Sequence, residues 1–168
     1  ALAAATMLFS IFANLLITPI IMNQVRLVGL YQILSMSIDL EVLNESPLLQ
    51  NMSRYQRRKA ILISEFHEFE KGELLVKQDT IGRNMHLILS GEAEVIRRDG
   101  NESRLLATLK PGQIFGEVGY IRETERTADV VATKKVSSLR FDYERMQKDL
   151  KFFPNIVAKL NFNISYIL

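Results

Sequence analysis

The most informative stretch of this chain is FGEVGYIRETERTADVVA, residues 115–132. Within it, Gly116 and Glu117 open a short helix, and Arg126 follows after a tight bend. The start of a helix presents unpaired backbone N–H groups and a positive dipole end, and both favour a phosphate group. An arginine fork can hold two phosphate oxygens at once, and a carboxylate can accept a hydrogen bond from a ribose hydroxyl. The stretch therefore predicts a pocket for a cyclic nucleotide.

This stretch resembles the phosphate-binding cassette of the cyclic-nucleotide-binding domain family. The family pattern is F-G-E, a small residue two positions on, and then R-[ST]-A. The chain matches it with Phe115-Gly116-Glu117, Gly119 and Arg126-Thr127-Ala128. The resemblance implies that the ligand is cAMP or cGMP and that no cofactor is needed. The ligand-binding residues that it implies are Phe115, Gly116, Glu117, Val118, Gly119, Arg126, Thr127 and Ala128.

The resemblance extends over residues 47–168. Four turn glycines fall where the family places its own, namely Gly72, Gly82, Gly91 and Gly112. The chain departs from the family at Tyr120, where leucine is commoner, and at His86, where the family usually has an aromatic residue. The choice between cAMP and cGMP stays open, since Thr127 could bond a guanine amino group but threonine also occurs in cAMP-selective relatives. We favour cAMP.

Taken singly, the two charged residues of the cassette also fit ordinary surface roles. The helix dipole favours a carboxylate at the position of Glu117 with or without a ligand. A lone arginine such as Arg126 is usually solvated or paired with an acid, and the nearby acids are Glu123, Glu125 and Asp129. The surrounding glycine turns favour the ligand-binding interpretation.

Between residues 63 and 142 the apolar residues alternate with a period of two, which indicates β-strands. The predicted strands are residues 63–69, 74–77, 86–89, 93–97, 105–109, 113–115, 127–132 and 136–141. Turn signals such as Asp99-Gly100-Asn101 separate them. Many short strands at close spacing predict a mainly β barrel or jelly roll with flanking helices. The resemblance specifies this fold as the cyclic-nucleotide-binding β-roll, placed after an N-terminal hydrophobic helix.

Helices flank the predicted strands. Ser46 as N-cap and Pro47 at the first helical position predict a helix that continues to about residue 61. Its RYQRRK run, residues 54–59, predicts a solvated face, with contact to anionic lipid as the alternative. After residue 142 the pattern predicts a helix through about residue 150 and another from about Pro154 to the end. The resemblance implies that the last helix folds over the barrel mouth as a lid, with ordinary packing as the alternative for each candidate lid residue. These candidates are Phe162, Ile164 and Tyr166.

Residues 1–22, ALAAATMLFSIFANLLITPIIM, contain no charged residue. About 20 helical residues span roughly 30 Å, the hydrocarbon thickness of a bilayer, so this segment predicts a transmembrane helix. We expect its polar face to pack against other transmembrane helices of the same protein or of a partner. That face consists of Thr6, Ser10, Asn14 and Thr18. Arg26 follows and favours a cytoplasmic position for the nucleotide-binding domain of a membrane protein. The alternative is a buried or oligomer-forming helix of a soluble protein.

These boundaries divide the chain into three parts. We expect a transmembrane helix at residues 1–22, as the C-terminal end of a membrane domain, and a helical connector at residues 23–45. The cyclic-nucleotide-binding domain with its C-terminal lid helices is expected at residues 46–168. The chain begins with alanine, so we expect part of a longer or processed protein with further membrane segments upstream. Homo-oligomer formation stays open.

The composition argues against several other functions. The chain has no cysteine, which excludes a disulfide framework and a zinc–thiolate site. A formal net charge of +2 is too small to predict nucleic-acid binding on its own. The two histidines lack metal-ligand spacing, and strand alternation predicts that His67 points outward. No nucleophile–base–orienter set can be assigned from spacing, so we expect no catalytic residues and no metal site. The chain is therefore interpreted as a sensor and not an enzyme.

Three kinds of protein could contain such a sensor. The sequence NLLITPII, residues 14–21, resembles the end of the last transmembrane helix of RND or MMPL-type exporters, with Asn14 where those helices carry an acid. This favours a regulatory domain that modulates a transporter allosterically, through the ligand's differential affinity for two states. The alternatives are a fragment of a cyclic-nucleotide-gated channel and a soluble cyclic-nucleotide-responsive transcription regulator without its helix-turn-helix.

Overall fold

The computed structural model describes residues 40–168 of the chain. The predicted transmembrane helix at residues 1–22 and the connector up to residue 39 lie outside the described residues. No helix within residues 40–168 has both the length and the hydropathy that crossing a bilayer requires.

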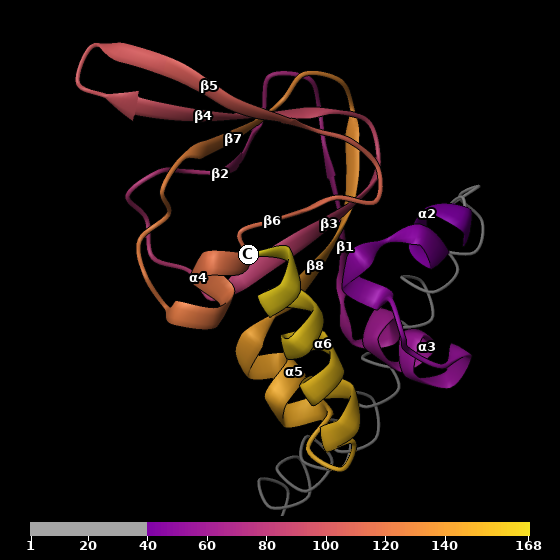
Figure 1. The fold of residues 1–168 in the computed structure, drawn as a ribbon. Helices are drawn as coiled ribbons and strands as arrows, with labels where there is room; N and C mark the ends of the chain where they lie inside the picture. Colours follow the sequence, from indigo (N-terminus) through magenta and orange to yellow (C-terminus); the bar gives the residue numbers. More distant parts are fainter. Residues whose placement is uncertain (1–39) are drawn as a thin grey trace, which may run out of the picture. The chain divides into compact units, whose positions relative to one another are not determined.

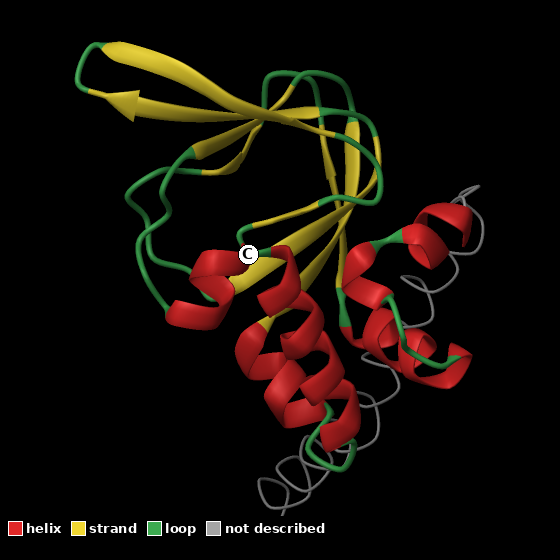
Figure 2. Cartoon of the chain, in the orientation of Figure 1, coloured by secondary structure: helices red, strands yellow, loops and turns green. Residues whose placement is uncertain are grey.

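Two four-stranded sheets form a β-roll (Figures 1 and 2). The strands of the first sheet are, in order, β1 (Glu65–Phe69), β8 (Val136–Asp142), β3 (Asn84–Ser90) and β6 (Ile114–Phe115). Those of the second sheet are β2 (Leu74–Val76), β7 (Asp129–Ala132), β4 (Ala93–Asp99) and β5 (Glu102–Leu109). All strand pairs are antiparallel. The predicted mainly β fold with flanking helices is confirmed, and the strand bounds differ from the predicted ones by only a few residues.

The inner faces of the two sheets form one apolar core. Ile88 and Val136 from the first sheet meet Val130 and Ala132 from the second in a single buried cluster. Residues two apart in a strand face the same side, so strand alternation brings these side chains together. Strand β3 is buried on both faces, since Met85 through Leu89 are all buried. The core therefore continues beneath the helices.

The helix predicted to start at Pro47 is divided into two helical elements. A 3-10 turn, η1 (Pro47–Leu49), is separated from α3 (Arg54–Ile63), and α2 (Leu40–Glu45) precedes both. The break arises because Ser53 begins a new helix: its hydroxyl accepts from Gln56 N–H, and Gln56 Oε1 accepts from Ser53 N–H. Ser46 is the N-cap residue of η1 and Pro47 is its first residue, as predicted, but the Ser46 hydroxyl makes no cap bond and donates to the Gly112 carbonyl at 3.0 Å.

Three helices follow the first strands. Helix α4 (Glu117–Arg122) interrupts the strands after β6, and α5 (Tyr143–Asp149) and α6 (Pro154–Ile167) follow β8. The Asp142 side chain caps α5 by accepting from Arg145 N–H at 3.0 Å. Helix α6 is tied to η1 by Asn163, whose side-chain amide donates to the Leu48 and Gln50 carbonyls at 2.8 Å each.

Candidate functional site

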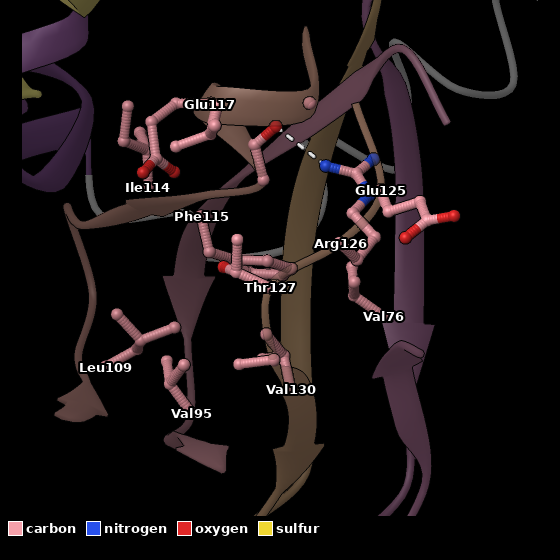
Figure 3. A pocket seen from close by; sticks show the side chains of 14 residues that line it. Val76, Val95, Leu109, Ile114, Phe115, Glu117, Glu125, Arg126, Thr127 and Val130 are labelled. Atoms are coloured by element: carbon pink, nitrogen blue, oxygen red, sulfur yellow. Dashed lines mark hydrogen bonds between the residues drawn. The ribbon is translucent and has the colours of Figure 1, made fainter. Parts of the chain in front are cut away.

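A pocket lies at the cassette between β6 and β7 (Figure 3), with a cavity volume of about 180 Å³. All eight predicted ligand-binding residues line it, as do apolar side chains from strands that the sequence did not single out. These further lining residues are Val76, Val95, Leu109, Ile114 and Val130, together with Glu125. The alternation pattern marks the strand residues as inward-facing, but it does not say that they form the floor of a pocket.

Helix α4 begins at the pocket with free donors. Its first intrahelical bond runs from Tyr120 N–H to the Gly116 carbonyl at 3.0 Å. The N–H groups of Glu117, Val118 and Gly119 precede that bond, and all three residues line the pocket. The start of α4 can therefore donate to an anion, as the sequence predicts.

Arg126 lies beside these donors and is only 6% exposed. Its Nη1 donates to the Gly116 carbonyl at 2.7 Å (Figure 3), and its Nη2 donates to the Asn84 carbonyl at 2.6 Å and to Asn84 Oδ1 at 3.0 Å. Burial lowers the pKa of the guanidinium, and the nearby Glu117 carboxylate opposes this shift. An arginine keeps its charge in proteins, so these neutral acceptors surround a buried cation.

The three acids that could have neutralised Arg126 are engaged elsewhere or point away. Glu123 pairs with Arg83 at 3.2 Å. Asp129 is buried, pairs with Arg98 at 2.5 Å and accepts from Gln78 N–H at 2.8 Å. The Glu125 carboxylate points away from the guanidinium in Figure 3. Glu117 lies near enough to oppose the lowering of the Arg126 pKa by burial but forms no ion pair with it. Within residues 40–168, Arg126 therefore forms no ion pair, and its positive charge stays available at the pocket.

Two glycines make room for the guanidinium. A Cβ added at Gly116 or at Gly119 would lie 2.7 Å from Arg126 Nη1, which is closer than real Cβ contacts come. Gly116 also has a φ of +81°, a backbone conformation that favours glycine. The F-G-E-x-G spacing in the sequence therefore provides the space in which Arg126 lies.

Asn84 is a site residue that the sequence did not reveal. It supplies two of the three acceptors of Arg126, although it lies 42 positions earlier in the chain. No local pattern pairs two residues at that separation. The strand pairing places Asn84 at the end of β3 opposite Asp142, beside the cassette.

A model of the cyclic nucleotide-binding domain family matches residues 66–151, just over half of the chain. This chain belongs to that family. The match includes the whole cassette and both sheets apart from Glu65. The chain therefore contains a cyclic nucleotide-binding regulatory domain, and the predicted resemblance of this part is confirmed.

Known relatives of the domain are regulatory proteins. The cAMP-dependent protein kinase regulatory subunit of Schizosaccharomyces pombe is 35% identical over 101 residues, which are 60% of this chain and 24% of that protein. The Cyclic AMP receptor protein of Thermus thermophilus is 29% identical over 119 residues, 68% of this chain and 55% of that protein. This chain spans about a quarter of the length of the kinase regulatory subunits that it matches.

Solved structures have the same fold. A cyclic nucleotide-binding domain from Methylobacillus flagellatus superposes with a TM-score of 0.68 at 23% identity, covering 76% of this chain and 72% of that one. The Thermus thermophilus Catabolite Activator Protein superposes with a TM-score of 0.65 at 25% identity, covering 72% and 57%. The β-roll is therefore the fold of this domain.

His86, where the family usually has an aromatic residue, lies beneath the cassette of the domain. Its ring stacks on Phe115 with centroids 5.0 Å apart and planes 4° apart, and Nδ1 lies 3.1 Å from the Ser138 hydroxyl. His67 was predicted to point outward, but its half-buried ring packs against the His86 ring at 6.0 Å. The imidazole of His86 therefore takes the place of an aromatic ring within the roll.

We expect His86 to make the domain acid-sensitive. Burial, reinforced by the neighbouring His67, Arg140 and Arg126, lowers the pKa of His86 to about 3. The folded-state pKa lies below the unfolded value of 6.5, so the unfolded chain takes up the proton first and stability falls as the pH drops below about 6.5. Between about pH 7.5 and about pH 5, urea unfolding of the parent should lose about 2 kcal/mol more than that of His86→Phe. Equal losses in the two proteins would show that His86 does not titrate on unfolding.

The candidate lid residues of the domain do not line the pocket. Ile164 is fully buried, whereas Phe162 is 65% and Tyr166 87% exposed. Helix α6 packs on η1 through Asn163, which accounts for the burial of Ile164. The lid role of Phe162 and Tyr166 stays a prediction.

In the described part of the chain, no cluster of three or more metal-ligating side chains occurs.

Proposed function

We propose that the pocket at the cassette binds a cyclic nucleotide, with cAMP as the favoured ligand. The observation that carries this proposal is the buried, unpaired charge of Arg126 at the start of α4. Burying a cation without a counterion is costly, and an anionic ligand would supply the missing charge. The names of the relatives, a cAMP-dependent kinase subunit and a cyclic AMP receptor protein, support cAMP as the ligand.

The lining residues suggest how the ligand would lie. The cyclic phosphate would take the place beside Arg126 and the N–H groups of Val118 and Gly119. The Glu117 carboxylate would accept from the ribose hydroxyl. The base would extend toward Thr127 and the apolar strand residues, where its faces lose contact with water.

The volume of the pocket indicates whether a bound nucleotide would need a lid to be enclosed. At about 180 Å³ it is smaller than the roughly 300–1,000 Å³ of pockets that enclose drug-sized ligands. A bound nucleotide would therefore keep part of its surface open to solvent unless the C-terminal residues Phe162 and Tyr166 move over it. Such closure is the step by which binding would be transmitted to the rest of the protein.

Isothermal calorimetry of the full chain in detergent tests the ligand assignment. Titrations with cAMP and cGMP should give saturable heat, whereas AMP, with the same base and sugar but an open phosphate, should bind more weakly. Absence of heat with both cyclic nucleotides at millimolar concentration would refute the proposal.

Substitutions of Asn84 test whether the charge of Arg126 must stay unpaired for cAMP to bind. Asn84→Asp would place a carboxylate where the neutral Oδ1 now lies 3.0 Å from Arg126 Nη2. The new internal ion pair would compete with the ligand phosphate, so cAMP affinity should fall about tenfold, or ~1.4 kcal/mol. Asn84→Ala removes the same acceptor without adding charge and is expected to change the affinity less. If the two variants bind equally, charge neutralisation is not what matters at this position.

We further propose that the domain regulates a membrane protein, a transporter being the favoured kind. The uncharged residues 1–22 and the following Arg26 support this. The division into residues 1–22, 23–45 and 46–168 is part of the same proposal. The domain would then lie on the cytoplasmic side. Fractionation of the full-length protein tests the span, and protease protection tests the side. Recovery in the soluble fraction without detergent would favour the transcription-regulator alternative.

A further inference from the structure

Two segments outside the β-roll carry positive charge and no carboxylate. Residues 46–64 and 150–168 contain no Asp or Glu. Their cations are Arg54, Arg57, Arg58, Lys59, Lys151 and Lys159. The ion pairs of residues 40–168 involve other cations, and Asp149, which precedes the second segment, pairs with Arg145. The charge of these two segments is therefore not neutralised within the described part of the chain.

The two segments meet at a cluster of aromatic rings. Tyr55 of α3 and Phe153 of the α5–α6 turn pack edge to face with centroids 6.1 Å apart. Lys59 Nζ lies over both rings, 5.8 Å from Tyr55 and 5.1 Å from Phe153. The next ring, Phe152, is 84% exposed, and Tyr55 is 53% exposed. Cations and exposed aromatic residues therefore gather where α3 meets the α5–α6 turn.

We call this surface the basic–aromatic face; it consists of Arg54, Tyr55, Arg58, Lys59, Lys151 and Phe152. Arg54 and Arg58 are one helical turn apart on α3 and exposed, so they extend on the same side. The α5–α6 turn lies at the end of the helices remote from the two sheets (Figure 1). The face is therefore separate from the nucleotide pocket.

We propose that the basic–aromatic face docks on an anionic lipid bilayer. Lysine and arginine near an anionic leaflet are attracted to its headgroups, and their long stems can follow apolar surface while the charge stays in water. Burying an exposed phenylalanine ring in the headgroup–acyl boundary is favourable, and tyrosine is enriched at membrane–water interfaces. The face offers both contributions side by side.

One observation favours lipid over an acidic macromolecule. The chain carries an uncharged stretch long enough to cross a bilayer before α3, at residues 1–22. The docking proposal does not depend on nucleotide binding.

The test uses the absence of tryptophan from the chain. Phe152→Trp in the full chain introduces a single tryptophan on the face, which can be excited selectively over the tyrosines. In vesicles of phosphatidylcholine and phosphatidylserine with brominated acyl chains, Trp emission should shift to the blue and be quenched. Pure phosphatidylcholine vesicles or high salt should remove most of the quenching, because the attraction is electrostatic.

Charge reversal and a second probe position provide the controls. Arg54→Glu with Arg58→Glu in the Phe152→Trp chain should lower the ratio of quenched to unquenched Trp by about thirtyfold or more, since each basic residue contributes about fivefold. Leu106→Trp, on the β4–β5 hairpin and 48% exposed in the parent, should stay unquenched in the same vesicles. Thermal melts establish that each variant is folded.

Several results would overturn the proposal. These are no quenching of the Phe152→Trp chain, equal quenching in the two kinds of vesicle, and equal quenching at both probe positions. An emission shift on adding duplex DNA or polyglutamate, without any response to vesicles, would assign the face to nucleic acid or to an acidic protein.

Discussion

Arg126→Ala is expected to lose about 2–5 kcal/mol of cyclic-nucleotide binding, or roughly thirtyfold to several thousandfold in affinity. The substitution removes a buried cation that forms no ion pair within residues 40–168, so a bound phosphate would lose its charged partner. It also removes the Arg126 donor from the Asn84 carbonyl and one of the two donors to the Gly116 carbonyl, which keeps its bond from Tyr120 N–H. Calorimetric titration with cAMP measures the loss directly.

Two further variants separate charge, geometry and folding. Arg126→Lys keeps the charge, but an ammonium cannot reproduce the planar fork that holds Gly116 and Asn84, so binding should weaken here as well. Arg122→Ala removes the same charge from an exposed position on α4 that does not line the pocket, and it should bind like the parent. If Arg126→Ala melts normally and binds cAMP like the parent, the assignment of the phosphate site is wrong.

Gly91→Ala is expected to destabilise the domain by about 4 kcal/mol or more, and to lower its melting temperature by about 10–20 °C. Gly91 joins β3 to β4 with a φ of +86°, which an alanine adopts only with strain. The added Cβ would lie 2.1 Å from the Lys135 carbonyl oxygen and 2.8 Å from Val136 Cα. Both atoms belong to backbone, so relief of the clash requires two turns to move apart.

The neighbouring turn provides a matched control. Gly72 has almost the same φ, +88°, but a Cβ there would meet nothing within 4 Å. Gly72→Ala should therefore cost only the backbone strain, about 1–2 kcal/mol. Equal melting temperatures for the two variants would contradict the close approach at Gly91.

The unpaired charge of Arg126 explains why the site is built from glycines and neutral acceptors. Gly116 and Gly119 leave space for the guanidinium, and Asn84 supplies two acceptors without supplying a negative charge. The arrangement keeps the arginine in place and leaves its charge for a ligand. A carboxylate at the same position would hold Arg126 equally well but would remove the reason for an anion to bind.

Much of the fold and the pocket could be predicted from the sequence, because these features depend on short-range rules. Alternation of apolar residues predicts most strand bounds, since side chains in a strand point to opposite faces in turn. Turn glycines such as Gly72 and Gly91 follow from the steric cost of a positive φ for other residues. The cassette is local as well: its eight predicted residues fall within a stretch of 14 and all line one pocket.

The features that the sequence could not predict depend on contacts between distant residues. Asn84 accepts hydrogen bonds from Arg126, which lies 42 positions later in the chain. Arg98 forms an ion pair with Asp129, which the sequence alone leaves as a possible partner of Arg126. The Ser46 hydroxyl bonds to the Gly112 carbonyl, 66 positions away, in place of a cap bond to η1. Ile164 and Tyr166 are two residues apart on one helix, yet the first is buried and the second exposed, because only one side of α6 meets η1. Local sequence fixes backbone conformation through steric preference, whereas a side chain's partner depends on which distant segment the folded chain places beside it.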